Sequence, residues 1–97
     1  MIERRHADRM KIGEPVVIAI EGREVPALLE DLSEHGALFR VDTRGAVSSD
    51  DLGMEGVFTI ATFTPARRYT GEIIRLFFRE GAAFFALRFW KGYTEVR

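Results

Sequence analysis

Short runs of β-branched and aromatic residues recur along this chain, and clusters of glycine, proline and small polar residues separate them. This alternation of runs and turn signals is typical of all-β domains. No stretch of roughly ten residues or more carries the apolar stripe that an amphipathic helix needs. The chain is therefore predicted to fold from strands alone.

Six strands are expected. They are placed at residues 15–21, 25–30, 37–42, 56–63, 67–78 and 82–90. In the last of them Phe85, Leu87 and Phe89 share one face, which indicates a half-buried strand. Gly71 interrupts the fifth run, and a glycine inside a strand often marks a bulge. Residues 43–55 are predicted to form a polar loop.

Two of the runs, residues 16–20 and 73–78, are apolar on both faces. An open sheet with one solvated face would not need this pattern, whereas a closed barrel with a covered outer patch would. Closure also removes exposed strand edges, which are a hazard in a chain with 8 phenylalanines. We predict a small six-stranded antiparallel β-barrel at residues 12–90.

The segments that flank the barrel are polar. Residues 1–11 are predicted to form a flexible N-terminal arginine arm, and residues 91–97 a short tail. A chain of 97 residues suits one domain with one core. Its 46% hydrophobic and 30% charged residues are typical of a globular protein rather than a disordered one. Residues 1–97 are therefore treated as a single domain.

Several classes of chemistry are excluded. The chain has no cysteine, so disulfide and thiolate chemistry are absent. No segment approaches the roughly 18 apolar residues of a membrane span, and residues 1–10 are too charged for a signal peptide. A cytoplasmic protein without membrane insertion is expected, as a monomer or weak dimer.

The balance of charge argues against nucleic acid as a partner. The formal net charge is −1, so no broad basic field attracts DNA or RNA. Twelve of the 14 basic residues are arginine, whose planar fork matches phosphate; codon bias in a GC-rich genome would give the same excess. Arg67, Arg68 and Tyr69 would suit an RNA-binding barrel, but the near-neutral charge makes this the less favoured alternative.

A polar turn at residues 30–37 holds the first candidate site. Asp31 offers acceptors for the N–H groups of a base edge, and Ser33 offers a hydroxyl to a phosphate or purine. In extended chain their side chains point the same way. Gly36 would permit a positive φ or a close approach to a ligand. A capped β-turn with Gly36 as its left-handed residue uses the same residues, so the turn alone leaves both interpretations open.

The second candidate site is a group of arginines near the start of the chain. Arg5 and Arg9 are four residues apart, so one local turn would place both guanidinium groups on one side. Arg4 adds a third cation. A solvated tail balanced by Glu3 and Asp8 is the alternative.

Taken together, the two clusters resemble the PilZ domain family. The signature of that family is R-x-x-x-R followed by D/N-x-S-x-x-G. The first motif matches Arg5 to Arg9, preceded by Arg4, and the second matches Asp31 to Gly36. The resemblance spans nearly the whole chain, because the six β-runs also match the six-stranded barrel of the family.

The resemblance implies binding of cyclic di-GMP, a bacterial second messenger with two phosphates and two guanines. Arg5 and Arg9 would hold phosphates and contact guanine, with Arg4 as an accessory contact. Asp31 would accept from a guanine edge. The implied ligand-binding residues are Arg4, Arg5, Arg9, Asp31, Ser33 and Gly36.

The predicted function is a receptor that changes conformation on binding cyclic di-GMP and signals to a downstream protein partner in motility, biofilm or related regulation. A PilZ-like interaction module that binds no nucleotide is the first alternative, and a small nucleic-acid-binding barrel is the second. No catalysis is expected: Asp31, Ser33 and His35 are too close in sequence for triad geometry. No metal site is predicted, because His6 and His35 lack partners at a ligand spacing.

The chain departs from the family pattern at its end. Many members carry a helix after the last strand, and residues 91–97 are too short for a substantial one, so little or no C-terminal helix is expected. The patch that such a helix would cover is then exposed or occupied by a partner. Its candidate residues, each of which would also suit an ordinary core, are Phe77, Phe78, Phe84 and Trp90.

Overall fold

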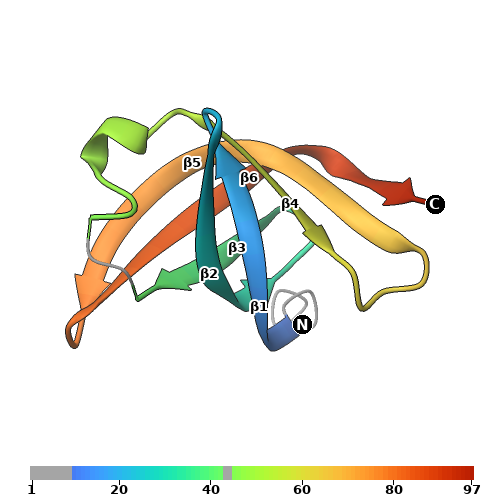
Figure 1. Ribbon diagram of the computed structural model, residues 1–97, viewed down its shortest axis with the longest axis horizontal. Coiled ribbons are helices and arrows are strands. Elements are labelled where there is room, and N and C mark those ends of the chain that lie inside the picture. Colours follow the sequence, from blue (N-terminus) through green and yellow to red (C-terminus); the bar gives the residue numbers. More distant parts are fainter. Residues whose placement is uncertain (1–9, 43–44) are drawn as a thin grey trace, which may run out of the picture.

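The computed structural model describes residues 10–42 and 45–97, and this part of the chain is built from six strands. Helical structure in these ranges amounts to one 3-10 turn, η1 (Ser49–Asp51). The all-β prediction is therefore confirmed. The strands are β1 (Met10–Ile20), β2 (Arg23–Leu32), β3 (Gly36–Val41), β4 (Glu55–Ile60), β5 (Ala66–Arg79) and β6 (Ala82–Val96), as Figure 1 shows.

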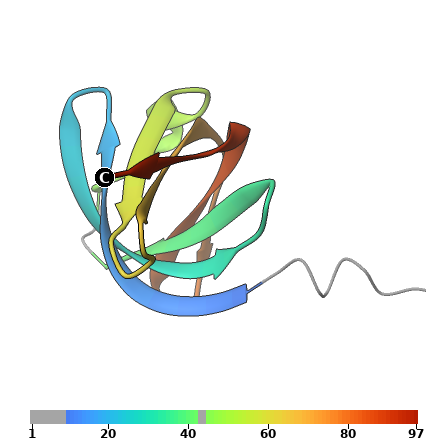
Figure 2. The ribbon, with the colours of Figure 1, turned by 90° about the vertical axis from the view of Figure 1, so that its right-hand side faces the viewer.

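The strands form a closed antiparallel barrel in the order β1-β2-β3-β6-β5-β4. Closure depends on a short ladder between β1 and β4, where Ala19 pairs with Val57 and Ile20 with Gly56. Figure 2 shows the strands wrapped around a common interior. The predicted six-stranded antiparallel barrel is confirmed.

The interior is filled by the inward face of each strand. Phe39 lies at its centre, with its ring centroid 4.9 Å from those of both Phe58 and Phe85. Such aromatic pairs contribute about 0.5–1.5 kcal/mol beyond the area that they bury. The face predicted from the pattern of β6 points inward: Phe85, Leu87 and Phe89 are 0%, 1% and 9% exposed.

The end of β6 differs from the sequence prediction. Residues 91–97 were expected to be a polar tail, and this is wrong, because β6 continues to Val96. Its last residues pair with the start of β5, from Tyr69 opposite Tyr93 to Ala66 opposite Val96. A strand ladder is made by main-chain groups and needs no apolar side chains. Because residues 91–97 are mostly polar, the sequence pattern did not predict this part of the strand.

The start of the barrel also lies earlier than predicted. β1 begins at Met10 rather than near residue 15, because Met10 pairs with Leu32 and Lys11 with Asp31. The boundary placed between arm and barrel at residues 11 and 12 is thus slightly late. The same pairing extends β2, so that Asp31 belongs to a strand and not to the turn that follows it. The candidate arginines Arg4, Arg5 and Arg9 lie outside the described residues.

A bulge near Gly71 was predicted, and the extra residues belong to β6. Gly71 pairs with Phe89 and Tyr69 pairs with Tyr93, so residues 90–92 lie opposite a single residue of β5. As a result both Phe89 and Tyr93 face Tyr69, with ring centroids 4.7 and 5.5 Å away. A Cβ on Gly71 would lie 2.2 Å from a carbonyl oxygen of β6. We call residues 90–92 the β6 bulge.

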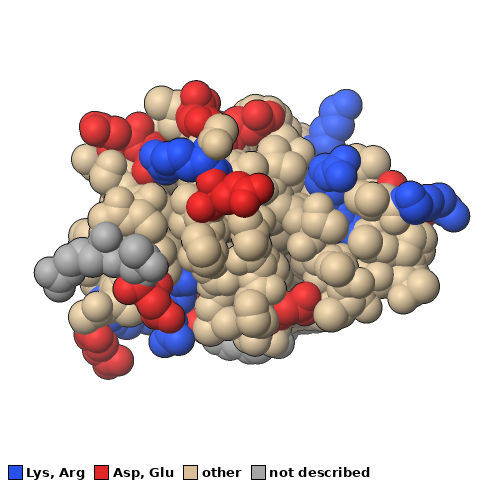
Figure 3. All heavy atoms as spheres, in the orientation of Figure 1, with Lys and Arg blue, Asp and Glu red and all other residues tan. Residues whose placement is uncertain are grey.

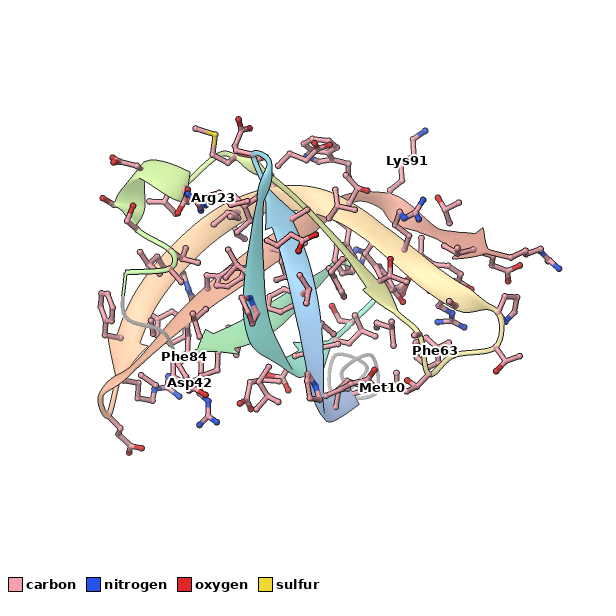
Figure 4. The ribbon with its side chains drawn as sticks, in the orientation of Figure 1. Met10, Arg23, Asp42, Phe63, Phe84 and Lys91 are labelled. Atoms are coloured by element: carbon pink, nitrogen blue, oxygen red, sulfur yellow. The ribbon has the colours of Figure 1, made fainter. Side chains whose placement is uncertain are left out.

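The loop before β4 is tied to the turn between β1 and β2. Asp51 is 6% exposed, and its Oδ1 accepts a hydrogen bond from Arg23 Nη2 at 3.1 Å. Its Oδ2 accepts from the Ser48 amide at 2.9 Å, which completes a capping box around η1. Figure 4 shows Arg23 beside this turn. The predicted polar loop therefore contains a short ordered element.

The four aromatic residues predicted to form an uncovered patch all lie outside the buried core. Phe78 and Trp90 are 72% and 57% exposed. Phe77 and Phe84 are half-buried and stack on each other, with ring centroids 5.3 Å apart and planes 9° from parallel. No helix in the described ranges is long and apolar enough to cross a membrane.

Candidate ligand-binding site

Ser33 holds together the turn between β2 and β3. Its amide donates a hydrogen bond to the Gly36 carbonyl oxygen at 2.9 Å. Its Oγ accepts from the amides of His35 and Gly36, both at 3.2 Å, and donates to the Gly36 carbonyl oxygen at 3.3 Å. A small side chain that bonds nearby main-chain groups is the usual means of fixing such a turn. The capped-turn interpretation of Ser33 is therefore correct.

Gly36 has a packing role that was not among the two considered in the sequence. It is the first residue of β3 and does not adopt a positive φ, so the expected left-handed conformation is wrong. A Cβ at this position would lie 2.4 Å from the Leu87 carbonyl oxygen. Glycine is needed here because the main chains of β3 and β6 approach closely where Gly36 pairs with Arg88.

Asp31 is half-buried near the end of β2, where the register with β3 shifts between Leu29 and Asp31. It borders, together with Ser33 and Gly36, a hollow of about 310 Å³ on the outside of the barrel. The structure thus brings these three predicted site residues together. We call this space the sheet hollow, because its other walls come from β3, β5 and β6.

Two cations that were not predicted also border the sheet hollow, Arg75 from β5 and Arg88 from β6. Arg88 Nη2 lies 3.7 Å from Glu72 Oε1 in an exposed ion pair. The guanidinium carbon of Arg75 lies 4.9 Å from the centre of the Phe77 ring. The hollow therefore combines acceptors on the β2 side with guanidinium donors on the β5–β6 side.

A second hollow, of about 570 Å³, lies on the other side of the same turn. It shares Leu32, Ser33 and His35 with the sheet hollow. Its far wall includes the whole β6 bulge, so we call it the bulge hollow. Met10, the first residue of β1, lies at its edge.

Arg67 brings a fixed positive charge to the bulge hollow. Its guanidinium carbon lies 4.3 Å from the Phe63 ring centre and 4.1 Å from that of Tyr93. A hydrogen bond with the Tyr69 side chain raises the pKa of Arg67 above its ordinary value, and the group stays charged. Lys91 projects outward from β6, and Phe63 lies on the turn before β5 (Figure 4). In Figure 3 basic side chains gather at the end of the barrel where β6 ends.

Residues 3–95 match the PilZ domain. This chain belongs to the PilZ domain family. The resemblance drawn from the two motifs is thereby confirmed. PilZ domains are non-catalytic, in agreement with the prediction that the chain is not an enzyme.

A solved structure with the same fold is that of the Bacillus subtilis Inhibitor of motility (MotI/DgrA). The TM-score is 0.70 and the sequence identity is 16%, over 94% of this chain and 44% of the other. This PilZ domain therefore spans less than half of that protein, and at this identity the likeness shows the fold alone. No curated protein matches the sequence.

The two PilZ motifs stand differently in the structure. Asp31, Ser33 and Gly36 of the second motif border one hollow, whereas Arg5 and Arg9 of the first lie outside the described residues. In residues 10–42 and 45–97, no three histidine or acidic side chains gather closely enough to hold a metal ion.

The cations of the sheet hollow were missed because they belong to no local motif. Arg75 and Arg88 lie far from Asp31 in sequence, and only the pairing of β3 with β6 and of β6 with β5 brings them to the same hollow. A signal was present in principle. The outward direction of Arg88 follows from the period of two, because Leu87 and Phe89 on either side of it are buried. Arg75 shares the alternation of the buried residues Tyr69 and Ile73, and it is exposed because the register of β5 shifts between Ile73 and Arg75.

Proposed function

We propose that this PilZ domain is a cyclic di-GMP receptor that relays ligand binding to a protein partner. Binding of this dinucleotide is typical of the family. The observation that carries the proposal is the sheet hollow, where the three residues of the second motif face Arg75 and Arg88. A ligand with two phosphates and two guanines needs both kinds of group, acceptors for the guanine N–H groups and cations for the phosphates.

Each side of the sheet hollow matches a part of that ligand. The Asp31 carboxylate accepts from the Watson–Crick edge of guanine, which presents N–H donors. The guanidinium groups of Arg75 and Arg88 suit phosphate oxygens or the O6 and N7 acceptors of guanine. The hollow of about 310 Å³ is at the small end of the range for ligand pockets. The rest of the enclosure must come from another segment.

The arginine arm is that segment. Arg9 is bonded to Met10, and Met10 pairs with Leu32 at the base of the turn. Because a residue of extended chain spans at most about 3.6 Å, Arg4 and Arg5 are also within about 20 Å of Met10. All three arginines can thus reach the turn. We take residues 1–97 as one domain, with the arm before Met10 and the barrel after it.

Ligand binding would convert the arm into an ordered cover. Fixing each residue costs about 1–2 kcal/mol of conformational entropy, and charge-assisted bonds from several guanidinium groups offset it. The surface presented by the arm differs between the free and bound states, which is the basis of a switch that a partner protein can read. Regulation of motility is the first process to test, because the structurally similar protein is an inhibitor of motility.

Isothermal titration calorimetry of the 97-residue chain tests this function. Cyclic di-GMP is the ligand, and GMP and a single-stranded RNA are the controls. We expect saturable heat with cyclic di-GMP alone. No heat at tens of micromolar protein would contradict the proposal and favour an interaction module that binds no nucleotide. Heat with RNA alone would favour the nucleic-acid-binding barrel.

A further inference from the structure

The β6 bulge carries an exposed tryptophan beside the proposed ligand site. Trp90 is 57% exposed and Tyr93 is 44% exposed, and both line the bulge hollow. Tryptophan and tyrosine combine a large apolar ring with a polar group, which makes them frequent at binding surfaces. Of the second-motif residues Asp31, Ser33 and Gly36, Ser33 alone lines this hollow.

The bulge places Trp90 next to the turn. The Phe89 amide donates a hydrogen bond to the His35 carbonyl oxygen at 2.8 Å, so Trp90 is one residue from a direct bond to the turn that carries Ser33. Residues 90–92 then leave the regular ladder. Bulges redirect side chains and recur next to binding sites.

The chemistry of the bulge hollow suits a planar base that is attached to a phosphate. Trp90 offers an accessible indole, and bases stack on such rings whatever their hydrogen-bonding edges. Arg67 is held between Phe63 and Tyr93 and remains charged, and Lys91 adds a second cation from the bulge. The two cations favour an anionic occupant over a neutral one.

The two hollows meet at the same three residues, Leu32, Ser33 and His35. A ligand seated on this turn therefore borders both. Cyclic di-GMP carries two guanines on one ring of two phosphates. Such a molecule can place one base on each side of the turn, whereas a mononucleotide can occupy only one side.

We propose that one guanine of bound cyclic di-GMP enters the bulge hollow and stacks on the Trp90 indole, while the other lies in the sheet hollow beside Asp31. This inference rests on the proposed function. It assigns to the β6 bulge the part of the ligand site that distinguishes a dinucleotide from a mononucleotide.

The test uses the fact that the chain contains 1 tryptophan. Its emission reports on the bulge hollow alone. We expect titration of the full chain with cyclic di-GMP to change the emission, with the same midpoint as calorimetry. Trp90→Ala should weaken binding by at least about tenfold, as expected for loss of one base stack. Trp90→Phe, which keeps a ring, should bind within about threefold of the wild type.

Phe78→Ala is the matched control, because Phe78 is also an exposed aromatic residue, on β5, and does not line either hollow at the turn. It should bind as the wild type does. Circular dichroism checks the fold of each variant; if Trp90→Ala does not fold, the change in wild-type emission decides.

The outcomes separate the two proposals. Suppose that the wild type gives heat with cyclic di-GMP, that its tryptophan emission does not change, and that Trp90→Ala binds with the same affinity. This result would overturn the role of the bulge hollow and leave the receptor function intact. Absence of heat with the wild type would overturn both.

Discussion

The amide of Phe89 donates a hydrogen bond to the carbonyl oxygen of His35 at 2.8 Å. This bond joins the turn of the second PilZ motif to β6 at the residue before the bulge. One residue further along, Gly36 packs directly against the main chain of β6. The turn and β6 are therefore held as one unit, and a ligand that contacts the turn also acts on the surface of β6.

Gly36→Ala should destabilise the barrel by at least about 2 kcal/mol, because the new Cβ would lie 2.4 Å from the Leu87 carbonyl oxygen and main chain cannot move aside cheaply. Urea denaturation measures the free energy of unfolding. Gly92→Ala is the control: a Cβ there meets nothing within 4 Å, and we expect a change within about 0.5 kcal/mol. If the two substitutions changed the free energy of unfolding equally, the main chains of β3 and β6 would not be in close contact at Gly36.

Ser33→Ala should lower the free energy of unfolding by about 1–2 kcal/mol, because the amides of His35 and Gly36 lose their acceptor. For a domain of this size the melting temperature falls by about 4–8 °C for each kcal/mol. Ser49→Ala provides the comparison, since Ser49 is exposed and caps nothing through its side chain. If Ser33→Ala melted like the wild type, Ser33 would not fix the turn.

Arg5→Ala and Arg9→Ala should each weaken cyclic di-GMP binding by about 10- to 100-fold, the equivalent of one charge-assisted hydrogen bond of about 1.5–3 kcal/mol. The melting temperature should stay unchanged, because both residues belong to the predicted arm and come before the described part of the barrel in the sequence. Calorimetry measures the affinity. Arg97→Ala is the matched loss of charge, since Arg97 forms an exposed ion pair with Glu95. Normal binding by either arm variant would remove that residue from the site.

Asp51→Ala should cost about 1–3 kcal/mol of stability, because it removes both the bond to Arg23 and the capping box of η1. Asp50→Ala, a change in an exposed neighbour, should be close to neutral. Thermal melting measures both. Neither variant should alter cyclic di-GMP affinity, because η1 borders neither of the hollows at the turn. Weaker binding by a folded Asp51→Ala would place part of the site elsewhere.

The strand pattern could be predicted where side chains report on burial. The alternation that ends in Phe89 defines the inward face of β6, since burial selects apolar side chains at every second residue. The ends of β1 and β6 could not be predicted. The pairings of Met10 with Leu32 and of Val96 with Ala66 use main-chain groups, which every residue carries.

The candidate site was predictable in part. The second PilZ motif identified Asp31, Ser33 and Gly36, but the geometric role given to Gly36 was wrong. Local conformation suggested a positive φ, whereas the requirement comes from a neighbouring strand that no local pattern reveals. The binding roles of the six predicted residues remain predictions for the experiments above.

The sequence by itself determined the all-β class, the six strands and the PilZ motifs, because these depend on side-chain alternation and on short spacings. Only the tertiary structure decided which distant residues share a surface. Arg75 and Arg88 line the sheet hollow, and Trp90 lines the bulge hollow with residues of the turn, through the register of β6 with β3 and β5. Register is a long-range property: it follows from closing the barrel around its core, and no single segment of the chain specifies it.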